Sequence, residues 1–217
     1  MPESAVVLFD LDGTVIDSTE AIVESFHVAF THFKDAPPSD AAIVSGIGHP
    51  LKTMFEQLGV EPDRCEAYVT VYREHYRKVC NDKTVLVPQA REAVELMARH
   101  ARLGVVTTKT ARYSWEILKH LGIGDLFETV VGFEEVKNPK PHPEPILLAL
   151  ERMKKPAGPK WMIGDTPMDI LAAKAAGVTP MGVLSGYASK EELLKHECDI
   201  FGNALNACEN IVESLIK

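Results

Sequence analysis

Two aspartates two positions apart, Asp10 and Asp12, are the first residues of this sequence whose types and spacing could do chemistry. They follow an apolar run at 5–9 and precede Gly13, which lets the backbone turn. An apolar run without alternation is typical of a strand covered on both faces of a parallel sheet. Two carboxylates on one side of an extended segment need a cation or a shared proton between them. The pattern predicts either a cation-binding strand end or, more simply, a turn that closes a strand.

Two further side chains could bind an anion held by such a cation. Thr107 ends an apolar run at 103–106, where a hydroxyl and neighbouring N–H groups can donate to phosphate oxygens. Lys140 stands between two prolines, so a stiff backbone could hold its ammonium in fixed register with the carboxylates. The structural alternatives are an amino-terminal helix cap for Thr107 and a solvated loop lysine for Lys140.

A second pair of carboxylates, Asp165 and Asp169, follows the expected strand at 160–163. Asp169 lies near an expected helix start, so both side chains face the same side. Hard carboxylate oxygens suit Mg²⁺, which keeps several waters and uses few protein ligands. Taken alone, the two acids would fit a helix amino terminus equally well, since the helix dipole favours negative charge there. Joined to Asp10 and Asp12, they predict a magnesium site.

The elements that must position these residues alternate between strands and helices. Segments with strand patterns lie at 5–9, 103–109, 129–132, 160–163, 179–184 and 199–201. Helical spacing of apolar residues fills most of the intervals between them from 89 onward. Such alternation predicts an α/β fold, a Rossmann-like doubly wound and mostly parallel sheet. Open α/β sheets bind their ligands at the carboxyl ends of the strands, where the polar residues above would meet.

Residues 15–84 interrupt this alternation with helical patterns alone. Apolar residues recur at helical spacing, and Pro37-Pro38, Gly59 and Pro62 end or begin the helices. The predicted organisation is a Rossmann-like catalytic core at 1–14 and 85–217 with an inserted all-helical cap at 15–84. A mobile cap can close over a substrate and exclude water from the chemistry.

Four motifs stand in a fixed order: Asp10-Leu11-Asp12-Gly13-Thr14, the strand end at Thr107, Lys140-Pro141-His142-Pro143, and Gly164-Asp165 with Asp169. With these motifs, and over essentially its whole length, the chain resembles the phosphatases of the haloacid dehalogenase superfamily. The resemblance implies that Asp10 is the nucleophile and Asp12 the general acid/base. It also implies that the helical insertion is the cap of one large branch. Many members carry Asn after the hydroxyl of the second motif, where this chain has Thr108.

The resemblance further implies an enzyme that hydrolyses phosphoric monoesters through a covalent intermediate. Asp10 attacks phosphorus to form an aspartyl-phosphate, and Asp12 protonates the leaving oxygen and then deprotonates water. Mg²⁺ is held by Asp10, Asp165 and the backbone carbonyl of Asp12. Asp169 supports the metal site directly or through a neighbouring ligand. The expected contacts to the phosphoryl group come from Lys140, Thr107, Thr108 and Gly13.

The motif strings at 105–109 and 140–145 look most like the branch of phosphoglycolate phosphatases and pyrophosphatases. A sugar-phosphate mutase, an inorganic pyrophosphatase and a non-catalytic binding module are the alternatives. A carbon–halogen hydrolase is disfavoured, because it needs no Mg²⁺ and should lack Asp12 and the Gly164-Asp165 motif. His49 and Lys52 in the cap, with Lys109 in the core, are candidates to meet an anionic tail of the substrate.

Composition limits the partners of this chain of 217 residues. Its net charge is −8 and it has no run of Lys and Arg, so nucleic acid is not an expected partner. No run approaches the ~18 apolar residues that span a bilayer, and no signal peptide is evident. The four cysteines lack Cys-x-x-Cys spacing, which favours reduced thiols. We therefore expect a cytoplasmic protein, and the resemblance implies that it acts on a small phosphorylated metabolite.

Overall fold

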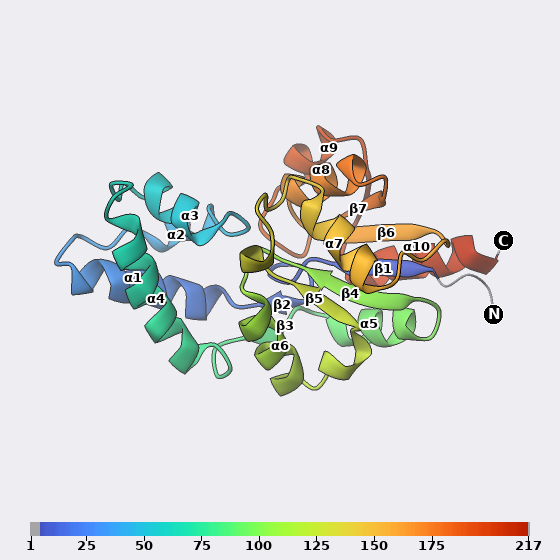
Figure 1. Cartoon of the computed structure of the whole chain (residues 1–217), viewed down its shortest axis with the longest axis horizontal. Helices are drawn as coiled ribbons and strands as arrows, with labels where there is room; N and C mark the ends of the chain where they lie inside the picture. The colour runs from blue at the N-terminus through green and yellow to red at the C-terminus, as the bar shows by residue number, and fades with distance from the viewer. Residues whose placement is uncertain (1–4, 217) are drawn as a thin grey trace. The chain divides into compact units, whose positions relative to one another are not determined.

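The structure, a computed structural model, describes residues 5–216 and contains a six-stranded sheet with the order β5-β4-β1-β6-β7-β8 (Figure 1). Every pair of neighbouring strands is parallel. The strands are β1 (Val6–Phe9), β4 (Arg102–Val106), β5 (Thr129–Val131), β6 (Lys160–Gly164), β7 (Thr179–Val183) and β8 (Asp199–Phe201). The predicted parallel α/β fold is confirmed.

Helices cover both faces of this sheet, as the absence of alternation in β1 requires. The helices are α5 (Ala90–Ala98), α6 (Ala111–His120), α7 (Glu144–Arg152), α8 (Pro167–Ala175), α9 (Lys190–Leu194) and α10 (Ala204–Ile216). Val6 and Leu8 of β1 point into a core built with α7 and α8. Phe9 packs edge-on against Phe127, at a distance of 6.1 Å between ring centroids. All four residues of β1 are buried, which accounts for their uniformly apolar types.

The strand order reverses beside β1, and this places the polar strand ends together. From β1 the chain runs outward through β4 and β5 on one side, and through β6, β7 and β8 on the other. Phe9 lies level with both Val105 and Ile163, so the residues that follow these three strands emerge at the same edge. Ligands in open α/β sheets bind at this kind of switch point.

The chain divides into two compact units, and the second comprises Ser18–Val85. It contains α1 (Thr19–His32), α2 (Asp40–Val44), α3 (Leu51–Gln57) and α4 (Cys65–Val79), and α1 packs mainly against α4. Its core is aromatic: the ring of Phe26 lies 4.5 Å from that of Phe55 and 5.0 Å from that of Tyr72, between centroids. We call it the helical unit; its function as a cap stays a prediction.

The unit boundaries fall slightly later than the expected 14/15 and 84/85. The difference arises from a small two-stranded sheet formed by β2 (Ile16–Asp17) and β3 (Val85–Leu86). The N–H groups of Val15 and Ile16 both donate to the carbonyl of Leu11, which ties these residues to the turn after β1. Strands of two residues are too short to give a periodic signal in a sequence.

Two short 3₁₀ helices, η1 (Gly124–Leu126) and η2 (Phe133–Glu135), complete the first unit. Among the described residues, no helix combines the length and the apolar character needed to cross a bilayer.

Candidate active site

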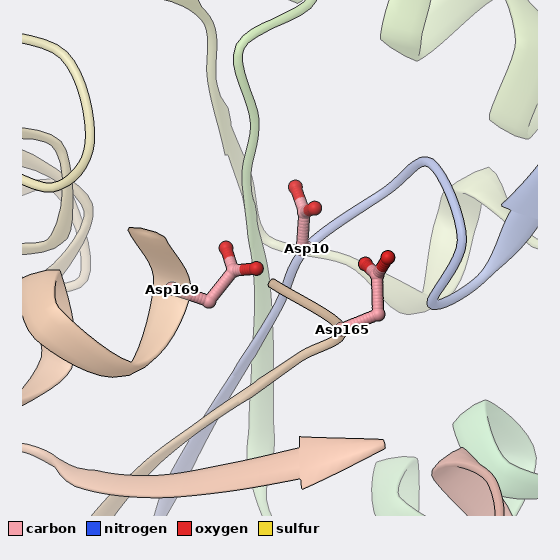
Figure 2. A group of neighbouring side chains, drawn as sticks. All are labelled: Asp10, Asp165 and Asp169. Carbon is pink, nitrogen blue, oxygen red and sulfur yellow. The ribbon is translucent and has the colours of Figure 1, made fainter. Parts of the chain in front are cut away.

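Three buried carboxylates meet at the carboxyl edge of the central sheet, where Figure 2 shows Asp10 between the other two. Asp10 directly follows β1, Asp165 directly follows β6, and Asp169 lies in the first turn of α8. One oxygen from each of the three carboxylates lies within 4.8 Å of the others. The structure therefore brings together three of the four aspartates that the sequence predicts for the site.

The ammonium of Lys140 enters this cluster from the loop before α7. Its Nζ donates to Asp10 Oδ1 at 2.7 Å, to Asp169 Oδ1 at 2.6 Å and to the carbonyl of Val106 at 3.1 Å. These contacts use all three donors of the ammonium group. Because Lys140 is only 3% exposed, it is not the solvated loop lysine of the structural alternative.

The charges of this cluster do not balance, and the carboxyl pKa values reflect it. Burial, followed by the charge of Asp169, raises the pKa of Asp10 well above its usual range. The same two causes raise the pKa of Asp165 to about 7. Burial lowers the pKa of Lys140, but the adjacent carboxylates of Asp10 and Asp169 raise it more, so Lys140 stays charged. Three acids facing one ammonium form an oxygen-only set that fits a hard divalent cation.

Asp165 is held between two glycines by two donors. Its Oδ1 accepts from the hydroxyl of Thr14 at 2.9 Å, and its Oδ2 accepts from the N–H of Tyr187 at 2.9 Å. A Cβ atom on Gly13 would lie 2.5 Å from Asp165 Oδ2, and one on Gly186 only 2.0 Å from it. Gly13 also has a backbone φ of +82°, which residues with a side chain rarely adopt. The sequence predicts Gly13 as a substrate contact, and the structure gives it a steric function beside Asp165.

Asp169 satisfies both interpretations that its position allows. Its Oδ2 accepts from the N–H of Thr166 at 3.0 Å and from its hydroxyl at 2.7 Å, so it caps α8. Its Oδ1 faces Lys140. One carboxylate thus fixes the start of a helix and contributes charge to the site.

Asp12 points its carboxylate elsewhere, toward Lys109. Lys109 Nζ lies 3.2 Å from Asp12 Oδ2, and the Asp12 carboxylate is not part of the three-acid cluster. Thr107 is buried, and its Oγ1 accepts from the N–H of Lys109 at 3.1 Å. The alternative that Thr107 caps the next helix is wrong, because Thr110 holds the N-cap position of α6. Thr108 lies half-buried beside these residues.

Lys52 and His49 belong to the helical unit, where Lys52 is exposed in the first turn of α3 and His49 is half-buried just before it. Their expected contact with substrate stays a prediction. Sequence reasoning missed Ser185, Gly186 and Tyr187, which follow β7 and contact Gly13 and Asp165. The Ser-Gly pair after a predicted strand was the available signal for this loop.

Comparisons with known proteins agree with this geometry. The family model of the haloacid dehalogenase-like hydrolases matches residues 7–183. Pyrophosphatase PpaX of Bacillus pumilus is 35% identical over 206 residues, which cover 92% of this chain and 93% of that protein. Phosphoglycolate phosphatase of Colwellia psychrerythraea is 31% identical over 203 residues, 89% of this chain and 90% of that protein.

Solved structures share the fold over nearly the whole chain. A haloacid dehalogenase-like hydrolase of Bacteroides fragilis has a TM-score of 0.85 at 31% identity, with 93% of this chain and 98% of that one covered. A predicted phosphatase of Clostridium acetobutylicum has a TM-score of 0.87 at 26% identity, with 97% of this chain and 99% of that one covered. The motifs and fold of the chain match those of phosphatases and pyrophosphatases to which it is similar, and the chain belongs to the haloacid dehalogenase-like hydrolase family.

Proposed function

We propose that this enzyme is a Mg²⁺-dependent phosphatase that hydrolyses a small phosphorylated metabolite through an aspartyl-phosphate on Asp10. The observation that carries the proposal is the position of Asp10. Its carboxylate lies at a strand end, 2.7 Å from the ammonium of Lys140 and close to Asp165 and Asp169. A nucleophilic carboxylate needs such surroundings, because the phosphoryl group it attacks brings further negative charge to the site.

In the proposed mechanism Asp10 attacks phosphorus in line, and Asp12 protonates the oxygen of the leaving group. Asp12 then deprotonates the water that hydrolyses the intermediate. Lys140 offsets the charge on the phosphoryl oxygens, while Thr107, Thr108 and Gly13 lie at neighbouring strand ends as further phosphate contacts.

Asp10, Asp165 and the backbone carbonyl of Asp12 are the proposed Mg²⁺ ligands, with Asp169 supporting them. When bound, the metal supplies positive charge next to the transferring phosphoryl group. The fit rests on the raised carboxyl pKa values of Asp10 and Asp165, which reflect a buried cluster with too little positive charge.

The relatives point to substrates with a second anionic group. Two of them are named for pyrophosphate and for phosphoglycolate, which carry a phosphate or a carboxylate beyond the cleaved phosphoryl group. We propose a substrate of this class, with the helical unit as a cap and Lys52 as the contact to the second anion. The proposed cap comprises residues 15–84, the range that the sequence pattern predicts.

The test is phosphate release from phosphoglycolate, pyrophosphate, a sugar phosphate and a nucleoside monophosphate, with Mg²⁺ and with EDTA. We expect Mg²⁺-dependent turnover that is fastest for one of the two doubly anionic compounds. In the presence of Mg²⁺, beryllium fluoride should bind to Asp10 of the wild-type enzyme and form an inactive mimic of the aspartyl-phosphate. Turnover that is unaffected by EDTA would contradict the proposed Mg²⁺ site. Binding of these compounds without hydrolysis of any of them would contradict the proposed phosphatase activity.

A further inference from the structure

A second ion pair lies at the same edge of the sheet, separate from Lys140. Lys109 Nζ lies 3.2 Å from Asp12 Oδ2, and the two side chains are only 10% and 11% exposed. Exposed ion pairs are screened by water and contribute little to the orientation of their partners. A pair this shielded restricts the carboxylate much more strongly.

The backbone of Lys109 is itself fixed on both sides. Its N–H donates to Thr107 Oγ1 at 3.1 Å, and its carbonyl accepts from the N–H of Phe133 at 3.1 Å. The ammonium therefore extends from a point anchored to the end of β4 and to the start of η2. Asp12 in turn follows β1, which pairs directly with β4. The two side chains reach each other across neighbouring strands.

The site thus contains two ammonium groups with different partners. Lys140 contacts Asp10 and Asp169 and has no donor left for a further carboxylate. Lys109 contacts Asp12. The proposed nucleophile and the proposed general acid/base are each paired with their own lysine.

We propose that Lys109 is a positioning residue for Asp12, a role that rests on the proposed function. A general acid must lie within about 2.6–3.2 Å of the atom it protonates, and an aspartate carboxylate has two rotatable bonds that can carry it away. The ion pair with Lys109 limits this rotation. The alternative, in which Lys109 contacts an anionic tail of the substrate, predicts different kinetics.

The test is a double-mutant cycle of Lys109→Met and Asp12→Ala, measured on phosphoglycolate and on p-nitrophenyl phosphate. Lys109→Met should lower kcat on phosphoglycolate by about 10- to 100-fold, the usual cost of a displaced catalytic group. The loss should be smaller on p-nitrophenyl phosphate, whose leaving group needs little protonation. In the Asp12→Ala background, Lys109→Met should change kcat by less than about 2-fold, because the group it positions is absent.

Two further variants control for folding and charge. Lys109→Arg keeps a cation at this position and should recover most of the lost kcat. Lys119→Met removes an exposed lysine of α6 and should leave both rates unchanged. Thermal unfolding midpoints of all variants identify any loss that reflects unfolding.

The possible failures point to different conclusions. An increase in KM that persists in the Asp12→Ala background would overturn positioning in favour of substrate binding by Lys109. Equal losses on both substrates, or no loss on either, would also overturn it. If Asp12→Ala itself were harmless, the general acid of the proposed function would be wrong, a result that does not depend on Lys109.

Discussion

Each of the two units contains a cluster of charged side chains, and the clusters differ in balance. In the core, Asp10, Asp165 and Asp169 face the single ammonium of Lys140, and all four residues are buried. Burial and mutual repulsion raise the pKa of Asp10 and of Asp165. One ammonium is too little positive charge for three carboxylates shielded from water.

The cluster of the helical unit is partly exposed, and both of its glutamates contact Lys83. Lys83 Nζ contacts Glu20 Oε1 at 2.7 Å and also contacts Glu24. Glu24 Oε1 lies 3.2 Å from His75 Nε2, and His75 Nδ1 lies 3.1 Å from the hydroxyl of Ser25. The hydrogen bond from Lys83 lowers the pKa of Glu24, the opposite direction to the core acids.

The direction of the pKa shift separates a cluster built for stability from one built for chemistry. A partly exposed acid that accepts a hydrogen bond from a cation, like Glu24, has a lowered pKa and stabilises the fold. A buried acid left with excess negative charge titrates above that range and destabilises the fold until a cation binds. Strongly perturbed groups at a strand edge are therefore candidates for function.

The largest expected effect comes from Asp10→Asn, which removes the nucleophile with little change in shape. Turnover should fall by at least about 10⁴-fold, as expected when a group that forms the covalent intermediate is lost. The measurement is kcat on phosphoglycolate, together with binding of beryllium fluoride, which should also be lost. The variant should unfold at nearly the wild-type temperature; near-normal hydrolysis by a folded variant would exclude a covalent intermediate on Asp10.

Asp12→Ala should be less damaging and should depend on the substrate. We expect a loss of roughly 10²–10⁴-fold on substrates with poor leaving groups, the usual contribution of a positioned general acid/base. The loss should shrink for p-nitrophenyl phosphate. A loss of the same size across leaving groups of different pKa would assign Asp12 to the metal or to the fold instead.

Removal of Mg²⁺ should reveal the imbalance of the core cluster as a pH-dependent stability. The folded pKa of Asp165 is about 7, above the usual aspartate value of 3.8, so the folded protein binds more protons between these values. Protonation of Asp165 therefore stabilises the folded state at low pH, and this stabilisation is lost as pH rises toward 7. Saturating Mg²⁺ should cancel the loss and add about 2.7 kcal/mol at a concentration 100 times its Kd.

The measurement is denaturant unfolding from pH 4 to 7, with Mg²⁺ and with EDTA. Asp165→Asn is the matched control, because it keeps the shape but cannot titrate. The difference in stability between wild type and this variant should fall with rising pH in EDTA. A difference that stays constant with pH would show that Asp165 is ionised throughout the range without a metal.

The positions of the functional residues at the strand ends were predictable, because local patterns of residue types indicate where each strand ends. The uniformly apolar strand 6–9, the strand pattern before Asp165 and the prolines around Lys140 are local patterns that place Asp10, Asp165 and Lys140 at one edge. Parallel strands end at a common edge, so local patterns were sufficient to predict a long-range cluster.

Other contacts leave no such trace in the sequence. Tyr187 reaches Asp165 through its backbone N–H, which every residue except proline could supply. The sequence indicates Lys109 only as a candidate contact to substrate, because nothing local reveals that its ammonium reaches Asp12 from a neighbouring strand. The boundary of the helical unit differs from the predicted one for a related reason, since β2 and β3 pair over two residues each.

Lys52→Ala tests the helical unit as the source of specificity. The core residues act on the phosphoryl group common to all substrates, so they cannot choose among leaving groups. Loss of a charge-assisted contact from Lys52 should lower kcat/KM on a doubly anionic substrate, by an amount equivalent to about 1–3 kcal/mol of transition-state stabilisation. Hydrolysis of p-nitrophenyl phosphate should hardly change, because it has no second anion. Lys78→Ala, an exposed lysine of α4, is the matched control.

The smallest effect is expected from Lys83→Met, which breaks the partly exposed cluster of the helical unit. Glu20 and Glu24 lose their shared cation but stay solvated, so the thermal midpoint should fall by at most about 4 °C, less at high salt. The value of kcat/KM should not change. Lys140→Met removes the same charge from the core and should abolish most turnover, because no solvent replaces the ammonium there. The contrast between the two clusters would be wrong if Lys83→Met impaired turnover as much as Lys140→Met, measured side by side with Mg²⁺.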